Sequence, residues 1–225
     1  MERGTLKTGL PLPWVVLSLL AVSSRATSIP GVGGIPEGYA IHDRAMADFD
    51  GDGVQETAYA LAWARGAEPG AQPPRLWVVR DGKRVLDLWL AQTNALLRNV
   101  GPEQDALQTG DLTGDGRPEL LFVPSSAGGS GGTQFPRVAT WTGSRFENVK
   151  LRGRTLAHIS ENGGAVIRPG RPNLPAVLIL FNLQQPGPRR YRAQRFHFRA
   201  GSLVGERERV SRRTGKAGLR ELGIK

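Results

Sequence analysis

The chain has 225 residues, 39% of them hydrophobic, so it is long enough and apolar enough to fold around a core of its own. It contains no cysteine, which excludes a disulfide framework, a thiolate metal site and lipid attachment through cysteine. The formal charge of +10 is consistent with a polyanionic partner, but it comes mostly from arginine, which a biased base composition in the gene explains equally well.

The first predicted element is a cleaved export signal over residues 1–26. The basic residues Arg3 and Lys7 precede the apolar run 14–22, and small residues follow where a signal peptidase cleaves. An uncleaved membrane anchor is the alternative, but the run is about half as long as a spanning helix. We therefore expect a linker at 27–37, no transmembrane segment in the mature chain, and a periplasmic or secreted location.

A unit then recurs three times, over residues 38–100, 101–160 and 161–205. Each unit begins with a Gly-rich polar loop, enters a short apolar run, crosses a Gly/Pro-rich linker and ends in a hairpin. The runs are rich in Val, Leu and aromatic residues and are bounded by Gly or Pro, which indicates strands. The repeat therefore predicts an all-β domain over 38–205, in which only 91–99 is compatible with a helix.

Turn residues mark the hairpin at the end of each unit. Asp81-Gly82 between two apolar runs is a strong hairpin signal, and residues 142–144 and 200–202 occupy the same place in the later units. Beyond them, residues 206–225 are highly charged and lack a sustained apolar face. That composition predicts a basic mobile tail.

The loops of the first two units carry closely spaced carboxylates. In the first loop, four of them lie at positions 1, 3, 5 and 9 of a nine-residue stretch in an otherwise basic chain. A hard divalent cation takes about six to eight oxygen ligands at about 2.3–2.6 Å, and alternating residues on a tight loop can supply them. Glycine at position 6, Gly53 or Gly116, allows the positive φ that turns the chain around the ion.

Two calcium sites follow from this spacing. The ligands predicted for the first are Asp48, Asp50, Asp52, the backbone carbonyl of Val54, and Glu56. The ligands predicted for the second are Asp111, Thr113, Asp115, the backbone carbonyl of Arg117, and Glu119. The second loop has fewer carboxylates, so we expect it to bind calcium more weakly, and the third unit has none in its loop.

These loops share positions 1, 3, 5 and 6 with an EF-hand but differ at position 12. An EF-hand requires a bidentate Glu there and flanking helices, whereas this chain has Tyr59 or Phe122 followed by a strand pattern. The sequence instead resembles the FG-GAP or VCBS type of repeat, best known from the integrin α-chain propeller. The likeness lies in residues 47–60, 109–123 and the turn at 141–146.

The resemblance implies propeller-blade-like β-repeats with calcium in a structural role between strands. Three units of roughly 60 residues are too few for a seven-bladed ring, so we expect an incomplete or small propeller.

The sequence favours a binding or assembly scaffold over an enzyme. His42, His158 and His197 lie in no pattern with Ser, Asp or Glu that is typical of a hydrolase or a zinc site. A protein, a glycan or a cell-surface polymer is the expected partner, and no nucleic acid is expected.

Two alternatives remain at this point. One is a module that binds a polyanion through the arginine-rich C-terminal part. The other, less favoured, is a metal-dependent hydrolase, which would need an open metal position and a base for which the sequence offers no candidate. The arginines of the first alternative are Arg189, Arg190, Arg192, Arg195, Arg199, Arg207, Arg209, Arg212 and Arg213.

Overall fold

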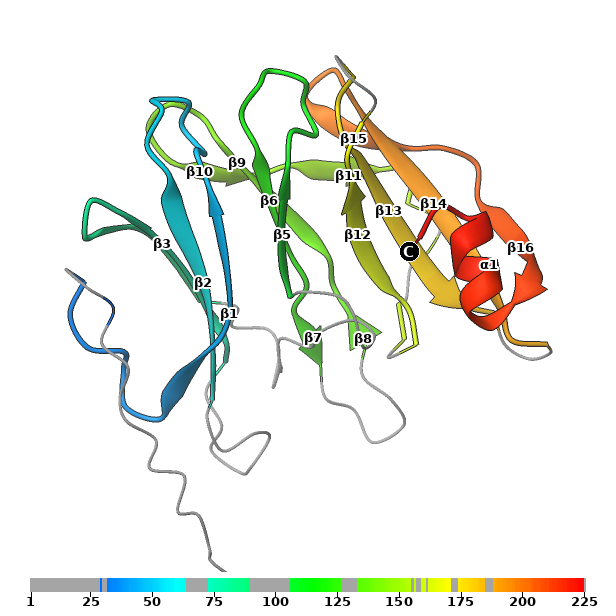
Figure 1. The fold of residues 1–225 in the computed structure, drawn as a ribbon, viewed down its shortest axis with the longest axis horizontal. Helices are drawn as coiled ribbons and strands as arrows, with labels where there is room; N and C mark the ends of the chain where they lie inside the picture. Colours follow the sequence, from blue (N-terminus) through cyan, green and yellow to red (C-terminus); the bar gives the residue numbers. More distant parts are fainter. Residues whose placement is uncertain are drawn as a thin grey trace, which may run out of the picture.

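Three antiparallel sheets stand side by side in chain order (Figure 1). The computed structural model describes residues 29, 32–63, 73–89, 106–126, 133–154, 156, 159–160, 162–170, 174–184 and 188–224. Over these residues the chain is built of strands with one short helix, which confirms the all-β class. None of the described sheets closes on itself. The predicted signal at 1–26 and the helix-compatible run 91–99 lie outside the described residues.

The first sheet is a meander in which each strand pairs with the next along the chain. Its strands are β1 (Tyr39–Ala47), β2 (Glu56–Trp63), β3 (Arg75–Arg80) and β4 (Lys83–Trp89). Asp81 and Gly82 connect β3 to β4 with φ values of 47° and 69°, the positive pair that a tight two-residue hairpin needs. The hairpin predicted at Asp81-Gly82 is confirmed.

The second sheet repeats this meander, with a small extra hairpin inserted before its third strand. Its strands are β5 (Leu107–Gly110), β6 (Glu119–Phe122), β9 (Arg137–Trp141) and β10 (Phe146–Asn148). The insert consists of β7 (Ser125–Ser126) and β8 (Thr133–Gln134), which pair with each other. The hairpin predicted around 142–144 joins β9 to β10.

The third sheet has the same meander with two further strands, β11 (Lys150–Arg152) and β16 (Arg209–Thr214). The meander consists of β12 (Gly164–Arg168), β13 (Val177–Leu183), β14 (Arg190–Arg199) and β15 (Ser202–Gly205). β11 pairs in parallel with β15, and β16 pairs with β14. The turn between β14 and β15, predicted at 200–202, has positive φ at Ala200 and Gly201.

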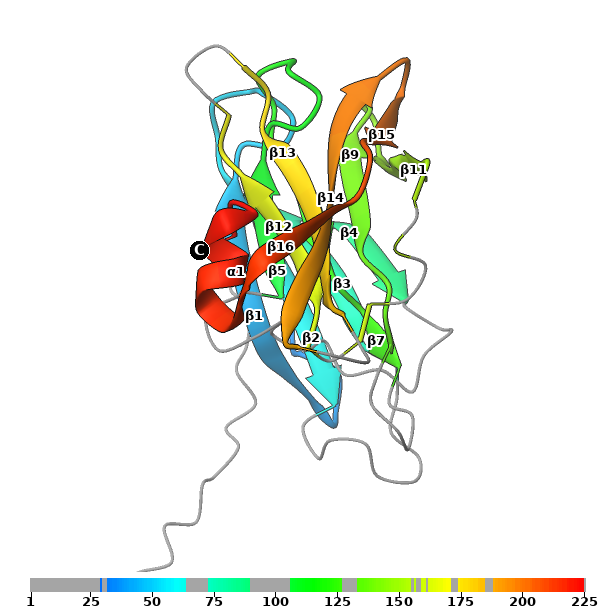
Figure 2. The same cartoon turned by 90° about the vertical axis from the view of Figure 1, so that its right-hand side faces the viewer.

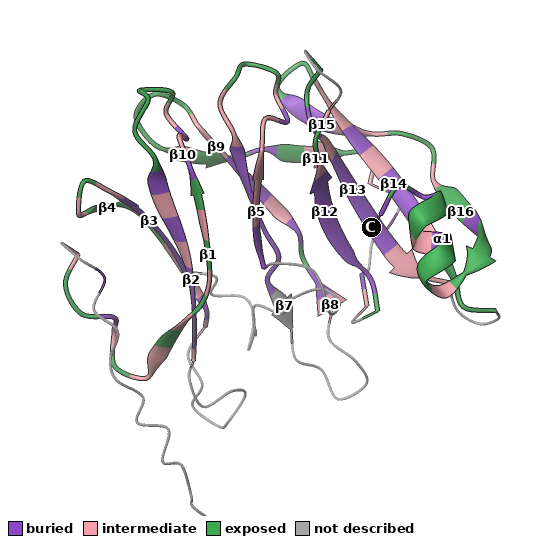
Figure 3. Ribbon diagram, viewed as in Figure 1, coloured by how far each residue is buried: buried purple, intermediate pink, exposed green. Residues whose placement is uncertain are grey.

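The core lies in layers between the sheets, because successive residues of a strand point to opposite faces. In Figure 3 the buried residues concentrate on the central strands and the exposed ones on the loops and on the helix α1 (Gly215–Glu221). Ala58, Ala60, Leu76 and Val78 of the first sheet pack in one cluster with Leu107, Leu120, Phe122 and Ala139 of the second. Leu121 and Val138 of the second sheet share a cluster with Leu178, Leu180 and Phe196 of the third.

Residues 29 and 32–35 lie against the outer face of the first sheet. Ile29 and Ile35 are buried there against Leu61, Trp77 and Val79. We predicted a linker for this stretch, and the structure differs because two isoleucines supply an apolar contact that a free linker would lack.

The C-terminal residues cover part of the outer face of the third sheet, on the side away from the second sheet (Figure 2). They form β16 and the helix α1 (Gly215–Glu221), after which Leu222 and Ile224 are buried in the cluster of the third sheet. The predicted mobile tail over 206–225 is therefore wrong for residues 206–224. The prediction rested on the high average charge of this segment and overlooked Leu222 and Ile224, the two apolar side chains that pack on the sheet.

Candidate metal centre

The two acidic loops lie at the same end of the sheets (Figure 1). Residues 48–55 connect β1 to β2, and residues 111–118 occupy the equivalent place between β5 and β6. The loops contact each other: a Cβ added to Gly51 would lie 3.1 Å from Cδ of Arg117. The second loop in turn meets the third connection, where the N–H of Ala176 donates to the carbonyl of Asp111 at 2.6 Å.

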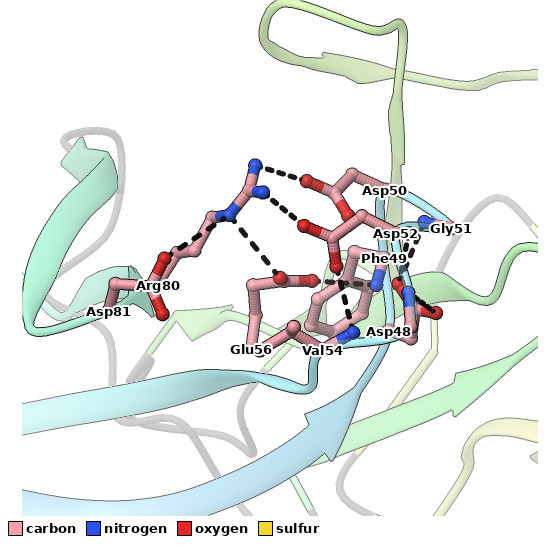
Figure 4. Close-up of polar contacts among 10 residues, drawn as sticks. Asp48, Phe49, Asp50, Gly51, Asp52, Val54, Glu56, Arg80 and Asp81 are labelled. Carbon is pink, nitrogen blue, oxygen red and sulfur yellow. Dashed lines mark hydrogen bonds and ion pairs between the residues drawn. The ribbon is translucent and has the colours of Figure 1, made fainter.

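Asp48 organises the first loop (Figure 4). Its Oδ1 accepts the N–H groups of Gly51 at 2.7 Å and Asp52 at 3.1 Å, and its Oδ2 accepts that of Gly53 at 2.9 Å. Gly53 has φ of 89°, as predicted for position 6, a conformation that a residue with a Cβ would adopt only with strain. The loop is thus folded tightly around one carboxylate.

Arg80 stands over the same loop, although no feature of the sequence singled it out. Its guanidinium forms ion pairs with Asp50 and Asp52, and its Nε lies 4.0 Å from Oε1 of Glu56 (Figure 4). The remaining oxygens of the two aspartates accept N–H groups of the loop itself, Asp52 at 3.2 Å and Val54 at 2.8 Å. The guanidinium of Arg80 therefore pairs with three of the predicted calcium ligands, Asp50, Asp52 and Glu56.

Glu56, the last predicted ligand of this loop, is buried with one oxygen unsatisfied. Its side chain is at the start of β2, and Oε2 accepts the N–H of Phe49 at 2.8 Å. Oε1 is buried and has no hydrogen-bond partner. Burial raises the pKa of Glu56, and the charges of Asp50 and Asp52 act in the same direction.

The carboxylates of Asp48, Asp50 and Glu56 converge. Their ligand oxygens all lie within 4.8 Å of one another. Two oxygens bound to one calcium ion are at most about 5 Å apart, so the three fit a single ion. Across the described ranges, no other group of three or more His, Asp or Glu side chains converges in this way. Asp52 forms an ion pair with Arg80 and does not belong to this trio.

The second loop has the same backbone shape but satisfies its carboxylates with protein donors. Asp111 accepts the N–H groups of Gly114 at 2.6 Å and Gly116 at 3.0 Å, and Asp115 accepts Nη2 of Arg117 at 2.5 Å. Partial burial by itself raises the pKa of Asp115. The hydrogen bonds from Arg117 outweigh this and hold the pKa below its ordinary value.

Glu119 shows the contrast with Glu56 most directly, because both residues are buried at loop position 9. Oε2 of Glu119 accepts the N–H groups of Leu112 at 2.7 Å and Thr113 at 3.1 Å. Its Oε1 accepts the hydroxyls of Thr113 at 3.1 Å and Thr140 at 3.0 Å, whereas Oε1 of Glu56 accepts none. Burial raises the pKa of Glu119 despite these bonds.

No protein-family model matches the chain. A search of curated proteins finds no significant match either. The likeness to FG-GAP repeats therefore rests on the loops and turns of this chain alone. No helix in the described part of the chain is long and apolar enough to cross a membrane.

Proposed function

We propose that the first loop binds a calcium ion and that the protein is an exported β-repeat scaffold for binding or assembly, not an enzyme. One observation carries the metal site: an unsatisfied, buried Oε1 of Glu56 belongs to a trio of carboxylates spaced for one ion. A divalent cation would satisfy that oxygen and offset the mutual repulsion of the trio. Calcium in this role is structural, because it would fix the loop between β1 and β2.

The second loop is proposed as a weaker site. Oε1 of Glu119 already accepts the hydroxyls of Thr113 and Thr140. The equivalent Oε1 of Glu56 in the first loop accepts no hydrogen bond. An ion in the second loop would have to displace the two hydroxyls and the guanidinium of Arg117 from Asp115.

We also propose that the three sheets are blade-like units of an incomplete propeller. Each contains a four-stranded meander, and the first strands of successive sheets, β1, β5 and β12, contact one another in that order. Parts of the outer faces of the first and third sheets are covered by residues 29, 32–35 and 215–224, as terminal caps cover a repeat array. A scaffold of this kind fits a protein, a glycan or a cell-surface polymer as partner.

Calcium is expected to raise the melting temperature of the chain. With Kd near ~10⁻⁴ M and free calcium near ~10⁻³ M, one site adds about 1.4 kcal/mol, or about 3–5 °C. Differential scanning calorimetry in calcium and in EGTA measures the shift. Asp50→Asn should remove most of it, while Asp81→Asn, the same change on an exposed turn beside Arg80, should retain it. Equal melting temperatures of the unaltered chain in calcium and EGTA would contradict the proposal.

Arg80→Gln sharpens this experiment because its expected effect has the opposite sign. Arg80 neutralises Asp50 and Asp52 in the absence of metal, so its loss should lower the melting temperature in EGTA. Calcium then no longer competes with Arg80 for Asp50 and Asp52, and its stabilising shift should exceed that of the unaltered chain. A smaller shift would mean that Arg80 assists the ion.

A second candidate function, polyanion binding, is favoured by one cluster of arginines. Arg212, Arg213 and Arg220 line a hollow of about 540 Å³ with Glu221, and none of the three guanidiniums forms an ion pair with a described residue. Glu221 instead accepts the backbone N–H groups of Arg212 and Arg213 at 3.0 and 3.1 Å. Unpaired guanidiniums close together suit sulfate, phosphate or carboxylate groups of a polymer.

Heparin chromatography tests this candidate with substitutions, since deletion of the segment would remove buried Leu222 and Ile224. Replacing Arg212, Arg213 and Arg220 together by Gln should lower the salt concentration of elution. The matched control replaces Arg44, Arg137 and Arg152, on β1, β9 and β11, by Gln. If the two triple variants elute at the same salt concentration, binding depends on net charge in general and not on this cluster.

A further inference from the structure

A groove of about 540 Å³ lies on the outer face of the third sheet, beside residues 215–224, which we call the C-terminal cap. Figure 2 shows this face with α1 and β16 toward the viewer. Strand register places it there: Ile179 of β13 pairs with Arg195 of β14, while the intervening pair Leu178 and Phe196 belongs to the buried core. The groove shares no residue with the acidic loops, although Ala176, one of its lining residues, donates its N–H to the carbonyl of Asp111 in the second loop. Its lining includes Arg168, Val177, Ile179, Arg195, His197 and Gly223.

The middle of the groove is apolar. Val177 and Ile179 are alternate residues of β13, the strand between β12 and β14. Leu174, in the connection before β13, lines the same groove and is 62% exposed, an unusual exposure for leucine. Ile179 is only 2% exposed, so the apolar surface that a ligand could cover comes mainly from Val177 and Leu174.

Two guanidiniums flank the apolar strip and converge. Arg168 reaches from β12 and donates from Nε to the carbonyl of Gly223 at 3.0 Å. Arg195 reaches from β14 on the other side, and its Nη2 lies 3.5 Å from the carbonyl of the adjacent Leu222. Both guanidiniums thus lie beside the adjacent carbonyls of Leu222 and Gly223. These contacts hold the two positive charges near each other.

The carboxylate of Glu206, which lies beside the groove, contacts His197 and forms no ion pair with Arg195. Oε1 of Glu206 lies 2.9 Å from Nε2 of His197, while Arg195 forms no ion pair with any residue in the described part of the chain. An arginine pair presents planar donors that match a carboxylate in geometry and charge.

We propose that this groove binds a small molecule that carries a carboxylate on an apolar body. The carboxylate lies between Arg168 and Arg195, and the apolar body covers Val177 and Leu174. The volume is within the range of small-molecule sites, about 300–1,000 Å³. Neither a neutral apolar molecule nor a compact anion such as phosphate would use both halves of the groove.

Isothermal titration calorimetry of the full chain with octanoate tests the proposal, with 1-octanol as the neutral analogue. We expect octanoate to bind about tenfold or more tightly than octanol, because hydrogen bonds to charged groups contribute about 1.5–3 kcal/mol. Arg195→Gln and Arg168→Gln should each weaken octanoate binding by about tenfold or more. Arg199→Gln, the same change at the exposed end of β14 outside the groove, should leave the affinity unchanged.

Three results would overturn the proposal. They are the absence of octanoate binding at millimolar concentration, equal affinity for octanoate and octanol, and equal affinity of the Arg195→Gln and Arg199→Gln variants. The comparison of octanoate with octanol needs no substitution, so it decides the question even if a variant folds poorly. The calcium experiments have a separate readout, so either idea can fail alone.

Discussion

Ile224→Ala is expected to lower the free energy of unfolding by about 2–5 kcal/mol. Ile224 is fully buried, and together with Leu222 it belongs to the apolar cluster of the third sheet. Truncation removes apolar surface from the core and leaves a cavity, because a sheet on one side and a short helix on the other have little freedom to collapse into it.

Urea denaturation followed by circular dichroism measures this loss, with Val210→Ala as the control. Val210 lies on β16 of the same C-terminal segment but is 46% exposed, so its truncation should change stability by about 0.5 kcal/mol or less. If both substitutions have the same small effect, the C-terminal residues do not pack on the third sheet and the groove beside them loses one wall.

Phe49→Ala is expected to be at least as severe, with a loss of about 3–5 kcal/mol. Phe49 lies in the first acidic loop but is 1% exposed, because its ring enters the core between the first and second sheets. Its centroid is 5.6 Å from that of Phe146 on β10, in an edge-on arrangement. Its backbone N–H also donates to Glu56, so the same residue joins the proposed metal site to the core.

The same denaturation experiment tests Phe49, with Phe135→Ala as the matched truncation. Phe135 is 37% exposed, so its loss should be clearly smaller. Phe49→Leu retains most of the volume and should cost less than about 1.5 kcal/mol. A Phe49→Ala variant as stable as Phe135→Ala would show that the loop is not anchored between the sheets.

Local sequence patterns predicted the hairpins and the glycines of the loops well, because these features depend on a few adjacent residues. Asp81 and Gly82 adopt the positive φ pair their residue types favour, and Gly53 turns the first loop at the expected position.

Contacts made across sheets could not be predicted in the same way. Arg80 follows Glu56 by 24 positions, and its place over the loop arises only when β2 pairs with β3. Thr140, which distinguishes Glu119 from Glu56, comes from β9 and is brought to the second loop by the pairing of β6 with β9. A sequence scan limited to each loop could count carboxylates, but it could not count the donors that reach them.

The prediction of a mobile C-terminal tail was wrong for a related reason. The prediction used the average charge of residues 206–225, whereas burial depends on where individual apolar side chains fall. Leu222 and Ile224 are separated by one residue and both are buried, although arginines and glutamates surround them in the sequence.

The two covering segments also bear on self-association. Sheets that stack face to face could in principle continue from one molecule into the next, which would give filaments. Residues 29, 32–35 and 215–224 cover parts of the faces at which such growth would begin. Trimming either segment is therefore expected to expose apolar sheet surface through which separate molecules could associate.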